Sequence, residues 1–170
     1  WQLSVLPTEY RVPEDARGAV YYQIFPDRFA QSGWCSPEGK LLPYTLKEFA
    51  SFVPNTPDAS DFAGGNLRGI AEKLDYIASF GVKYLYLNPI FLAASNHRYD
   101  TADYTRLDPL LGTEEDFANL CREAKDRGIR VVLDGVFSHT VALSSGGIPA
   151  SELAYIVSQE IFSANLPEYF

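Results

Sequence analysis

Three short stretches of the chain are apolar almost throughout, a pattern that is typical of strands buried on both faces of a sheet. They cover residues 19–25, 82–87 and 129–137 and are rich in valine, isoleucine, leucine and aromatic residues. Pro26 and Pro89 follow the first two stretches closely, and proline lacks the N–H that a strand ladder needs. The hydrophobic pattern therefore predicts three strands.

Two other segments place apolar residues three or four positions apart, which is the spacing of one face of a helix. The first covers residues 67–78 and follows Asn66, while the second follows Thr113, and both residue types are favoured at helix N-caps. Gly81 and Gly128 come after these segments, where glycine commonly ends a helix. The order strand, helix, strand, helix, strand predicts a parallel sheet built from right-handed βαβ units.

The remaining segments predict little regular structure. Residues 26–65 contain several prolines and, near residues 45–52, the composition of a short helix, while residues 88–112 are expected to form a loop. A connection as long as the first of these is usually functional or mobile. Residues 1–18 are expected to be a linker or the exit from a preceding segment, and residues 138–170 lose the periodicity.

Composition and charge narrow the class of partner. The chain has 170 residues, enough for one domain, and its 22 acidic against 14 basic side chains give a net charge of −8. Such a surface repels nucleic acid and anionic lipid, and no apolar run is long enough to span a membrane, so we expect neither as a partner. The chain begins at Trp1 and contains no methionine, which predicts a processed or excised piece of a longer protein.

The two cysteines, Cys35 and Cys121, are far apart in the sequence, and Cys121 lies on the apolar face of the second predicted helix. We expect both to be free thiols, with an intrachain disulfide as the alternative. No signal-peptide pattern opens the chain, so the sequence leaves the compartment undetermined, either cytoplasmic or secreted.

Polar and titratable residues follow two of the predicted strands. Asp134 and His139 come at the end of the third strand, and His97, the other of the chain's two histidines, lies beyond the second. Ligands bind at the carboxyl ends of the strands in parallel α/β sheets and barrels. The sequence therefore predicts a functional site at this edge of the sheet.

Four blocks of sequence, in a fixed order, carry a resemblance to a known family. They are VYYQIFPDRF at 20–29, FAGGNLRGIAEKLDYIASFGVKYLYLNPIF at 62–91, SNHRYDTADY at 95–104 and DGVFSHT at 134–140. Through them the chain resembles the α-amylase family of glycoside hydrolases (family 13), and is most similar to its neopullulanase, cyclomaltodextrinase and maltogenic-amylase branch. The resemblance implies an α/β fold, a partial (β/α)₈ TIM barrel. Residues 19–137 would supply its first three strands and two helices, and residues 138–170 the start of a domain inserted after strand three.

The resemblance also assigns roles to individual residues. Tyr99 matches the aromatic residue that stacks on the sugar next to the scissile bond, and His139 matches the histidine that bonds a hydroxyl of that sugar. His97 lies where related enzymes contact the next sugar outward, Asp134 would organise the floor of the site, and Asp100 would orient the loop. The alternatives are a core tyrosine, a structural histidine at 139, and surface roles for His97 and Asp100.

Two departures from the family bear on metal binding. Ser138 stands where many relatives have an asparagine that in several of them ligates calcium, and a hydroxyl is a poorer ligand for this cation. The segment after Phe29 lacks the Asp- and Asn-rich pattern of a second calcium loop. Calcium is thus a doubtful cofactor, and no other is implied. Asp27 and Arg28 are expected to form a buried ion pair at the end of the first strand, rather than to act in catalysis.

The family's catalytic carboxylates lie on strands four, five and seven, whose blocks do not occur in this chain. The resemblance therefore implies part of a retaining hydrolase of α-1,4-glucosidic bonds in starch, maltodextrin, cyclodextrin or pullulan. This chain would supply sugar-binding residues and no catalytic residue, and would be inactive alone. The alternatives are a non-catalytic family member serving as a binding or partner module, and a transglycosylase of the same family. The open edges of a partial barrel predict either an oligomer or a piece of a larger protein.

Overall fold

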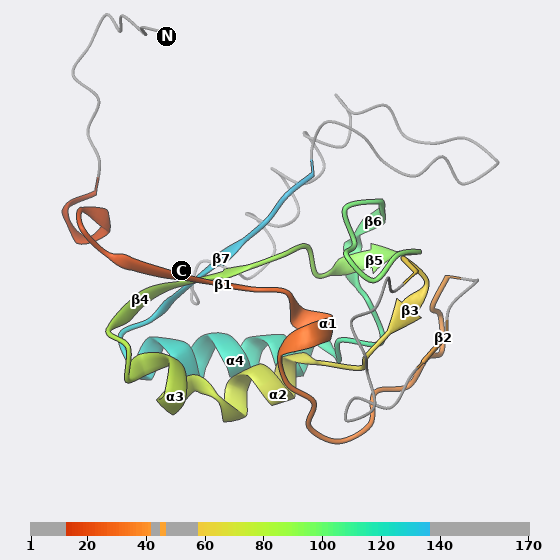
Figure 1. Ribbon diagram of the computed structural model, residues 1–170, viewed down its shortest axis with the longest axis horizontal. Coiled ribbons are helices and arrows are strands. Elements are labelled where there is room, and N and C mark those ends of the chain that lie inside the picture. The colour runs from red at the N-terminus through yellow and green to blue at the C-terminus, as the bar shows by residue number, and fades with distance from the viewer. Residues whose placement is uncertain (1–12, 42–44, 47–57, 137–170) are drawn as a thin grey trace, which may run out of the picture.

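A computed structural model describes residues 13–41, 45–46 and 58–136. Its central feature is a three-stranded parallel sheet in the order β1-β4-β7, formed by β1 (Val20–Ile24), β4 (Val82–Leu87) and β7 (Arg130–Leu133) (Figure 1). β4 lies in the middle, pairing Ile24 with Leu87 on one side and Leu87 with Leu133 on the other. The parallel βαβ arrangement predicted from the sequence is confirmed.

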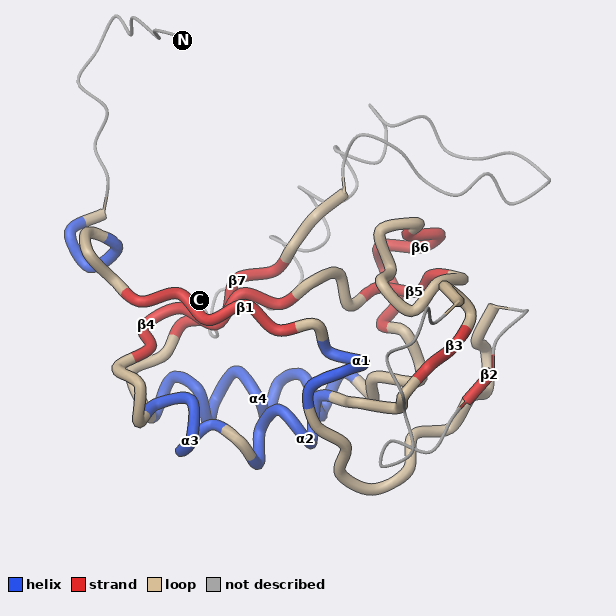
Figure 2. The backbone as a smooth tube through the Cα atoms, viewed as in Figure 1, coloured by secondary structure: helices blue, strands red, loops and turns tan. Residues whose placement is uncertain are grey.

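All three of the longer helices lie on one side of this sheet (Figure 2). The first predicted helix is interrupted: α2 (Leu67–Glu72) ends and α3 (Leu74–Ala78) begins at Lys73, whose φ of −100° and ψ of 5° depart from helical values. The second predicted helix is continuous as α4 (Glu114–Asp126). Both predicted caps are present, because the side chains of Asn66 and Thr113 accept hydrogen bonds from the backbone three residues on.

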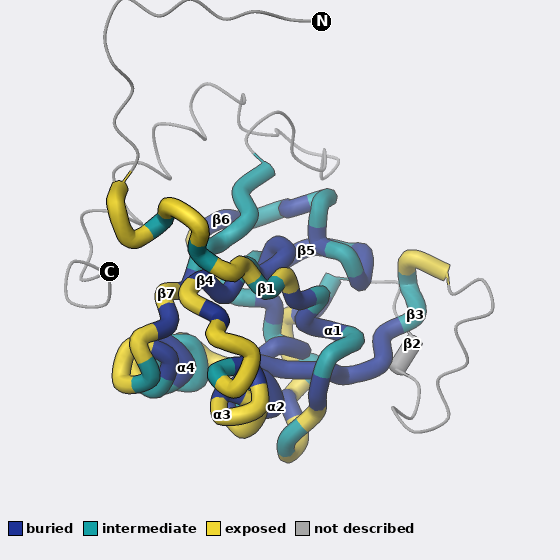
Figure 3. Tube along the Cα trace, turned by 60° about the vertical axis from the view of Figure 1, so that its left-hand side comes forward, coloured by how far each residue is buried: buried dark blue, intermediate teal, exposed yellow. Residues whose placement is uncertain are grey.

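The hydrophobic core lies between the sheet and the helices (Figure 3). Alternate residues of each strand face the helices because side chains project to opposite faces of a sheet. The side chains that are at most 1% exposed include Ile24, Leu85 and Leu87 from the strands and Ile70, Leu74, Ile77 and Leu120 from the helices. The same alternation directs Gln23 and Tyr86, which pair in the register, to the opposite face. That face belongs to the candidate site.

Several elements were not anticipated. The segment 88–112, expected to be a loop, contains the antiparallel pair β5 (Phe91–Ala93) and β6 (Thr101–Leu107). The single-turn helix α1 (Pro26–Phe29) follows β1, and the 3-10 helix η1 (Glu14–Ala16) lies in the expected linker.

One expected helix start and one expected strand end were wrong. In place of the helix expected at residues 45–52, residues 45–46 form β2 (Thr45–Leu46), which pairs in parallel with β3 (Asp61–Phe62), and residues 47–52 lie outside the described part. β7 ends at Leu133 rather than at residue 137, because β4 ends at Leu87 and offers no further ladder partner.

Cys35 and Cys121 are both buried and free, as expected. Within the described residues no helix is long and apolar enough to cross a membrane. The predicted inserted domain at 138–170, with Ser138 and His139, lies outside the residues that the structure describes.

Candidate functional site

The carboxyl ends of the three parallel strands are aligned by backbone hydrogen bonds that continue past the strands themselves. The Asn88 N–H donates to the Ile24 carbonyl, and the Asp134 N–H donates to the Leu87 carbonyl, each over 3.0 Å. The Gln23 side chain donates from Nε2 to Oδ1 of Asn88 over 2.8 Å. Gln23, Asn88 and Asp134 thereby share one edge of the sheet, where α/β sheets and barrels bind ligands.

Asp134 lies near two tyrosine side chains. The Tyr99 hydroxyl donates to Oδ2 of Asp134 over 2.7 Å. Burial, followed by the bond to Asp134, raises the pKa of Tyr99 to about 12, and burial and the nearby Asp134 carboxylate raise the pKa of Tyr86 in the same direction. Both phenols keep their protons at neutral pH, and the Tyr99 hydroxyl acts as a donor to Asp134. The structure brings the predicted residues Tyr99 and Asp134 together.

The loop between β5 and β6 contains hydrogen bonds to Asp100, whose role in orienting the loop stays a prediction. Its carboxylate accepts the Ser95 N–H over 3.0 Å and also accepts the Ser95 hydroxyl. Ser95 Oγ lies 2.9 Å from Nδ1 of His97, and the Tyr99 N–H donates to the same nitrogen over 3.1 Å. Because Nδ1 is an acceptor here, the neutral His97 ring carries its proton on Nε2.

His97 and Tyr99 lie side by side on this loop. Their ring centroids are 5.9 Å apart, with 32° between the ring planes, and both side chains are partly exposed. The two rings therefore form one aromatic surface beside Asp134, with the Nε2–H of His97 available as a hydrogen-bond donor.

Asp27 and Arg28 form the ion pair expected after the first strand. The Asp27 side chain is fully buried and accepts the N–H groups of Ala63, over 2.9 Å, and Gly64, over 3.2 Å. Arg28 donates to the Asp61 carbonyl over 3.1 Å. These contacts fix the chain between β3 and α2 to the end of β1, so Asp27 has a structural role.

The described residues do not fit a calcium site. In the part of the chain that the structure covers, no group of three or more histidine, cysteine or acidic side chains converges as metal ligands. The segment after Phe29 instead directs the ammonium group of Lys40 into the interior. No step of the function is therefore assigned to a metal.

Sequence reasoning missed Tyr86 and the pair formed by Gln23 and Asn88. The signal was available in the alternation of VYYQI and VKYLYL, since Gln23 and Tyr86 fall on the face opposite to the core residues. His139 lies outside the described residues, so its contact with the same ligand as Tyr99 stays a prediction.

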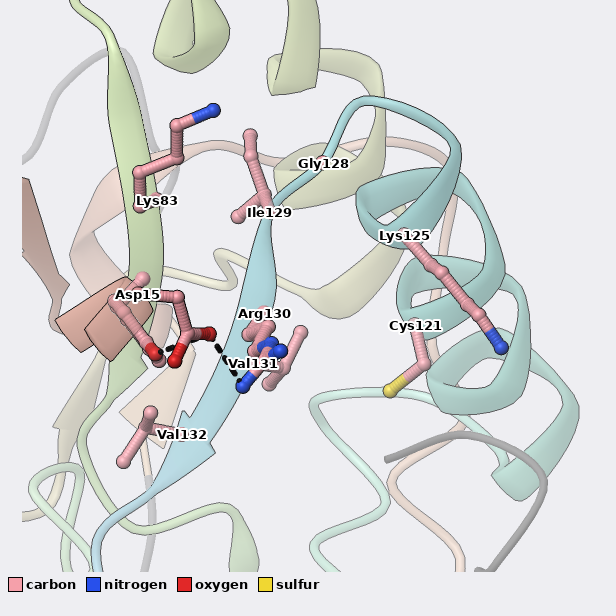
Figure 4. Close-up of a pocket in the computed structure, with 10 residues that line it drawn as sticks. Asp15, Lys83, Cys121, Lys125, Gly128, Ile129, Arg130, Val131 and Val132 are labelled. Carbon is pink, nitrogen blue, oxygen red and sulfur yellow. Dashed lines mark hydrogen bonds and ion pairs between the residues drawn. The ribbon is translucent and has the colours of Figure 1, made fainter. Parts of the chain in front are cut away.

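A cavity of about 910 Å³ lies at the opposite end of the sheet, by the first residues of β4 and β7 (Figure 4). Asp15 pairs there with Arg130 over 2.7 Å, and Cys121 points toward it from α4. The cavity borders the outer edge of β7, which has no strand partner among the described residues. It contains none of the predicted site residues, so we place the site at Tyr99 and Asp134 instead.

Comparisons with known proteins identify the family. Residues 23–145 match the family described as alpha amylase, catalytic domain. The chain belongs to this family. Its alpha-amylase relatives include the amylopullulanase of Thermoanaerobacterium saccharolyticum, which is 40% identical over 158 residues, 82% of this chain and 12% of that protein. The intracellular maltogenic amylase of Bacillus subtilis strain 168 is 44% identical over 130 residues, 76% of this chain and 21% of that protein.

Solved alpha-amylase structures resemble the fold as well. The cyclic alpha-maltosyl-(1→6)-maltose hydrolase from Arthrobacter globiformis matches with a TM-score of 0.66 and 41% identity, over 89% of this chain and 31% of that one. A cyclomaltodextrinase matches with a TM-score of 0.61 and 38% identity, over 77% of this chain and 21% of that one. These neighbours are TIM-barrel enzymes, so the three-stranded sheet is part of such a barrel. The chain spans only 12% and 21% of the two curated relatives named above.

Proposed function

We propose that this chain forms part of the sugar-binding floor of a retaining glycoside hydrolase that cleaves α-1,4-glucosidic bonds in starch, maltodextrin, cyclodextrin or pullulan. Two lines of support are membership of the alpha-amylase family and relatives named as maltogenic amylase and cyclomaltodextrinase. The observation that carries the proposal is the 2.7 Å bond that holds the Tyr99 ring at the carboxyl ends of the strands.

The chemistry of Tyr99 suits a sugar. An aromatic ring presents an apolar face, onto which the C–H face of a pyranose packs while the sugar hydroxyls stay hydrogen-bonded at its rim. The bond to Asp134 fixes the direction of the Tyr99 ring before a ligand arrives, so binding costs less conformational entropy. The Nε2–H of His97 is a donor to a hydroxyl of the neighbouring sugar. His139 is proposed as a further partner for the sugar on Tyr99.

The chain itself is proposed to carry out no bond cleavage. A retaining glycosidase needs two carboxyl groups about 5–5.5 Å apart, one on each side of the glycosidic bond. The carboxylates near the candidate site already have other partners: Asp134 accepts from Tyr99, Asp100 accepts from Ser95, and Asp27 accepts backbone N–H groups. The nucleophile and the acid are therefore expected in other parts of a longer protein. Asp134 holds the Tyr99 ring in place.

The test is a titration of the isotopically labelled 170-residue chain with maltotriose, followed by NMR. We expect shifts of the Tyr99 and His97 signals and a Kd of roughly 1 mM, since only part of a site is present. Tyr99→Ala should abolish the response, whereas the matched control Tyr76→Ala should keep it, because Tyr76 is 51% exposed on α3. Cellotriose, with β-linkages, should not compete.

Three outcomes contradict the proposal. A response that survives Tyr99→Ala, or an equal response to cellotriose, would place sugar binding elsewhere or remove its specificity. Release of glucose or maltose by the purified chain would show that it contains its own catalytic carboxylates. Sedimentation of the same sample tests a second expectation, that the open edges of β1 and β7 associate into an oligomer.

The two alternative functions are separated by the products of a longer protein that contains this chain. Incubation with maltotriose should release shorter sugars if the protein is a hydrolase. Sugars longer than maltotriose would indicate transglycosylation, which differs in the acceptor that the site admits. Binding without turnover would indicate a non-catalytic partner module.

A further inference from the structure

Three charged side chains form a buried cluster at the β5–β6 loop, which also carries His97 and Tyr99. Arg98 and Asp108 are 0% exposed and Lys40 is 8% exposed. Oδ2 of Asp108 lies 3.2 Å from Nε of Arg98 and 2.5 Å from Nζ of Lys40. We call these three residues the charge cluster. They come from the segment after α1, from the β5–β6 loop and from the turn after β6.

The charge cluster is bound to the backbone of the loop as well as to itself. Lys40 Nζ donates to the Ala93 carbonyl over 2.5 Å, and Nη1 of Arg98 donates to the Asn96 carbonyl over 2.9 Å. The ring of Phe62 covers both cations, at 4.5 Å from Lys40 Nζ and 5.4 Å from Arg98 Cζ. The loop is therefore tied from inside to β3 and to the segment after α1.

Arg98 has a backbone conformation that a side chain of this kind rarely adopts. Its φ is 59°, in the left-handed region, and Arg98 is the one described residue other than glycine with a positive φ. The Arg98 N–H is held by Ser95 Oγ over 3.1 Å. The reversal at Arg98 brings its two neighbours, His97 and Tyr99, to one side of the loop, where the Tyr99 N–H meets Nδ1 of His97.

We propose that Arg98 is a positioning residue for sugar binding, which acts by holding Tyr99 and His97 in place through Asp108 and Lys40. This inference rests on the proposed function, since it concerns the same site. The planar guanidinium donates from Nη1 to the Asn96 carbonyl in a fixed direction and pairs by charge with the Asp108 carboxylate, so these two contacts define how the loop backbone is oriented.

Stability alone does not account for the charge cluster. Burial of ions costs desolvation energy that well-packed apolar residues would not incur. Nη2 of Arg98 is buried and, in the part of the chain described, has no hydrogen-bond partner. Burial lowers the pKa of Lys40, and Asp108 offsets this only in part. A geometric role explains why charged residues occupy this place.

The experiment compares Arg98→Lys and Arg98→Met with the wild-type chain. Arg98→Lys keeps the positive charge beside Asp108 but loses the planar guanidinium group, and Arg98→Met loses both. Arg106→Lys is the matched control, because Arg106 is exposed on β6. The readouts are the maltotriose Kd and the ¹³Cζ signal of Tyr99, followed through its titration. The Leu120 amide signal reports whether the core remains folded.

Both Arg98 variants should weaken maltotriose binding about tenfold while the Leu120 signal is unchanged. The Tyr99 pKa, raised to about 12 in the wild type, should fall toward the ordinary value of 10 as the ring becomes less buried and its bond to Asp134 loosens. Arg106→Lys should change neither readout. A folded Arg98→Lys chain with wild-type Kd and wild-type Tyr99 titration would overturn the inference, even if Arg98→Met fails to fold.

Different results would contradict the proposed function and the positioning role of Arg98. Absence of maltotriose binding by the wild type would contradict the proposed function, while the Tyr99 titration in the Arg98 variants would still decide whether Arg98 positions that ring. Normal maltotriose binding by both Arg98 variants would leave the function intact and contradict the positioning role.

Discussion

The Tyr99 hydroxyl lies 2.7 Å from Oδ2 of Asp134, and this bond joins the β5–β6 loop to the end of β7. The two residues are 35 positions apart in the chain. Burial and the nearby Asp134 carboxylate raise the pKa of Tyr86 on β4, so three segments meet near Asp134. The aromatic surface of the candidate site is therefore fixed by a tertiary contact and not by the loop alone.

Tyr99→Phe tests what this bond contributes. The variant keeps the ring and loses the hydroxyl, so we expect it to retain maltotriose binding within a fewfold of wild type, unlike Tyr99→Ala. Its free energy of unfolding should fall by about 1 kcal/mol, the net value of one partly buried hydrogen bond. Urea denaturation and an NMR titration check both effects. A binding loss as large as that of Tyr99→Ala would mean that the hydroxyl, and not the ring face, contacts the sugar.

The alkaline pH dependence of stability should contain a contribution from Tyr99. Burial and the bond to Asp134 raise its pKa to about 12, against 10.0 for an unperturbed tyrosine. A group whose pKa is raised on folding stabilises the folded state fully below its unfolded pKa, and this stability is lost as the pH rises through the folded pKa. The window is thus pH 10 to 12.

Urea denaturation of the wild type and of Tyr99→Phe across this window provides the measurement. The unfolding free energies of the two proteins should converge as the pH rises, because only the wild type loses the Tyr99 contribution. Tyr84 and Tyr104, whose pKa values are also raised, are present in both proteins and cancel, whereas Tyr86 interacts with Tyr99 and Asp134 and contributes to the difference. A constant difference between the two proteins would show that Tyr99 has an ordinary pKa.

Removing each of the two N-cap side chains should lower the free energy of unfolding by a different amount. Asn66 is 1% exposed, caps α2 through the Gly69 N–H over 2.8 Å, and also bonds both the N–H and the carbonyl of Ser32. Thr113 caps α4 at an exposed position. Asn66→Ala should cost about 3 kcal/mol of unfolding free energy and Thr113→Ala about 1 kcal/mol, by chemical denaturation. Equal losses would mean that Asn66 acts only as a cap.

Gly69→Ala should destabilise the chain, although alanine is usually the better helix former. A Cβ at Gly69 would lie 2.2 Å from the Ala30 carbonyl oxygen, a backbone atom that cannot turn away. We expect a loss of about 3 kcal/mol in the free energy of unfolding. Gly128→Ala is the comparison: its φ is 68° and its Cβ would meet nothing nearer than 3.9 Å, so strain alone should cost about 1 kcal/mol. A stabilised Gly69→Ala variant would contradict the close approach of α2 to the segment after α1.

Local signals in the sequence predicted the local features of the fold. Asn66 and Thr113 cap helices, and Gly81 and Gly128 have positive φ where helices end, because each feature depends on neighbouring residues only. The interruption at Lys73 was not predicted, since the apolar spacing continues through it. The β5–β6 pair was missed for another reason. Its partners, such as Leu92 and Asp103, are separated by a loop that gives no short hairpin signal.

In the candidate site, the sequence likewise identified residues but not the contacts between them. Tyr99, Asp100 and Asp134 could be named from sequence blocks that resemble a family, but their contacts could not. Nothing in the sequence connects Lys40 with Asp108, because the choice of ion-pair partner depends on which distant segments the fold brings together. The alternation of its strand places Tyr86 on the face opposite to Leu85 and Leu87, but the sequence does not show which residues lie across from it.

The sequence by itself determined the order of the three main strands and of the helical segments between them, the caps at Asn66 and Thr113, the parallel sheet and the family. Hydrophobic periodicity and capping act within short stretches of chain. Only the tertiary structure decided which way Tyr99 faces and what holds it there. That direction depends on the carboxylate of Asp134 in front of the loop and the buried charge of Arg98 behind it. Tyr99 and Asp134 are 35 positions apart, and the geometry of both contacts follows from packing, which local patterns do not encode.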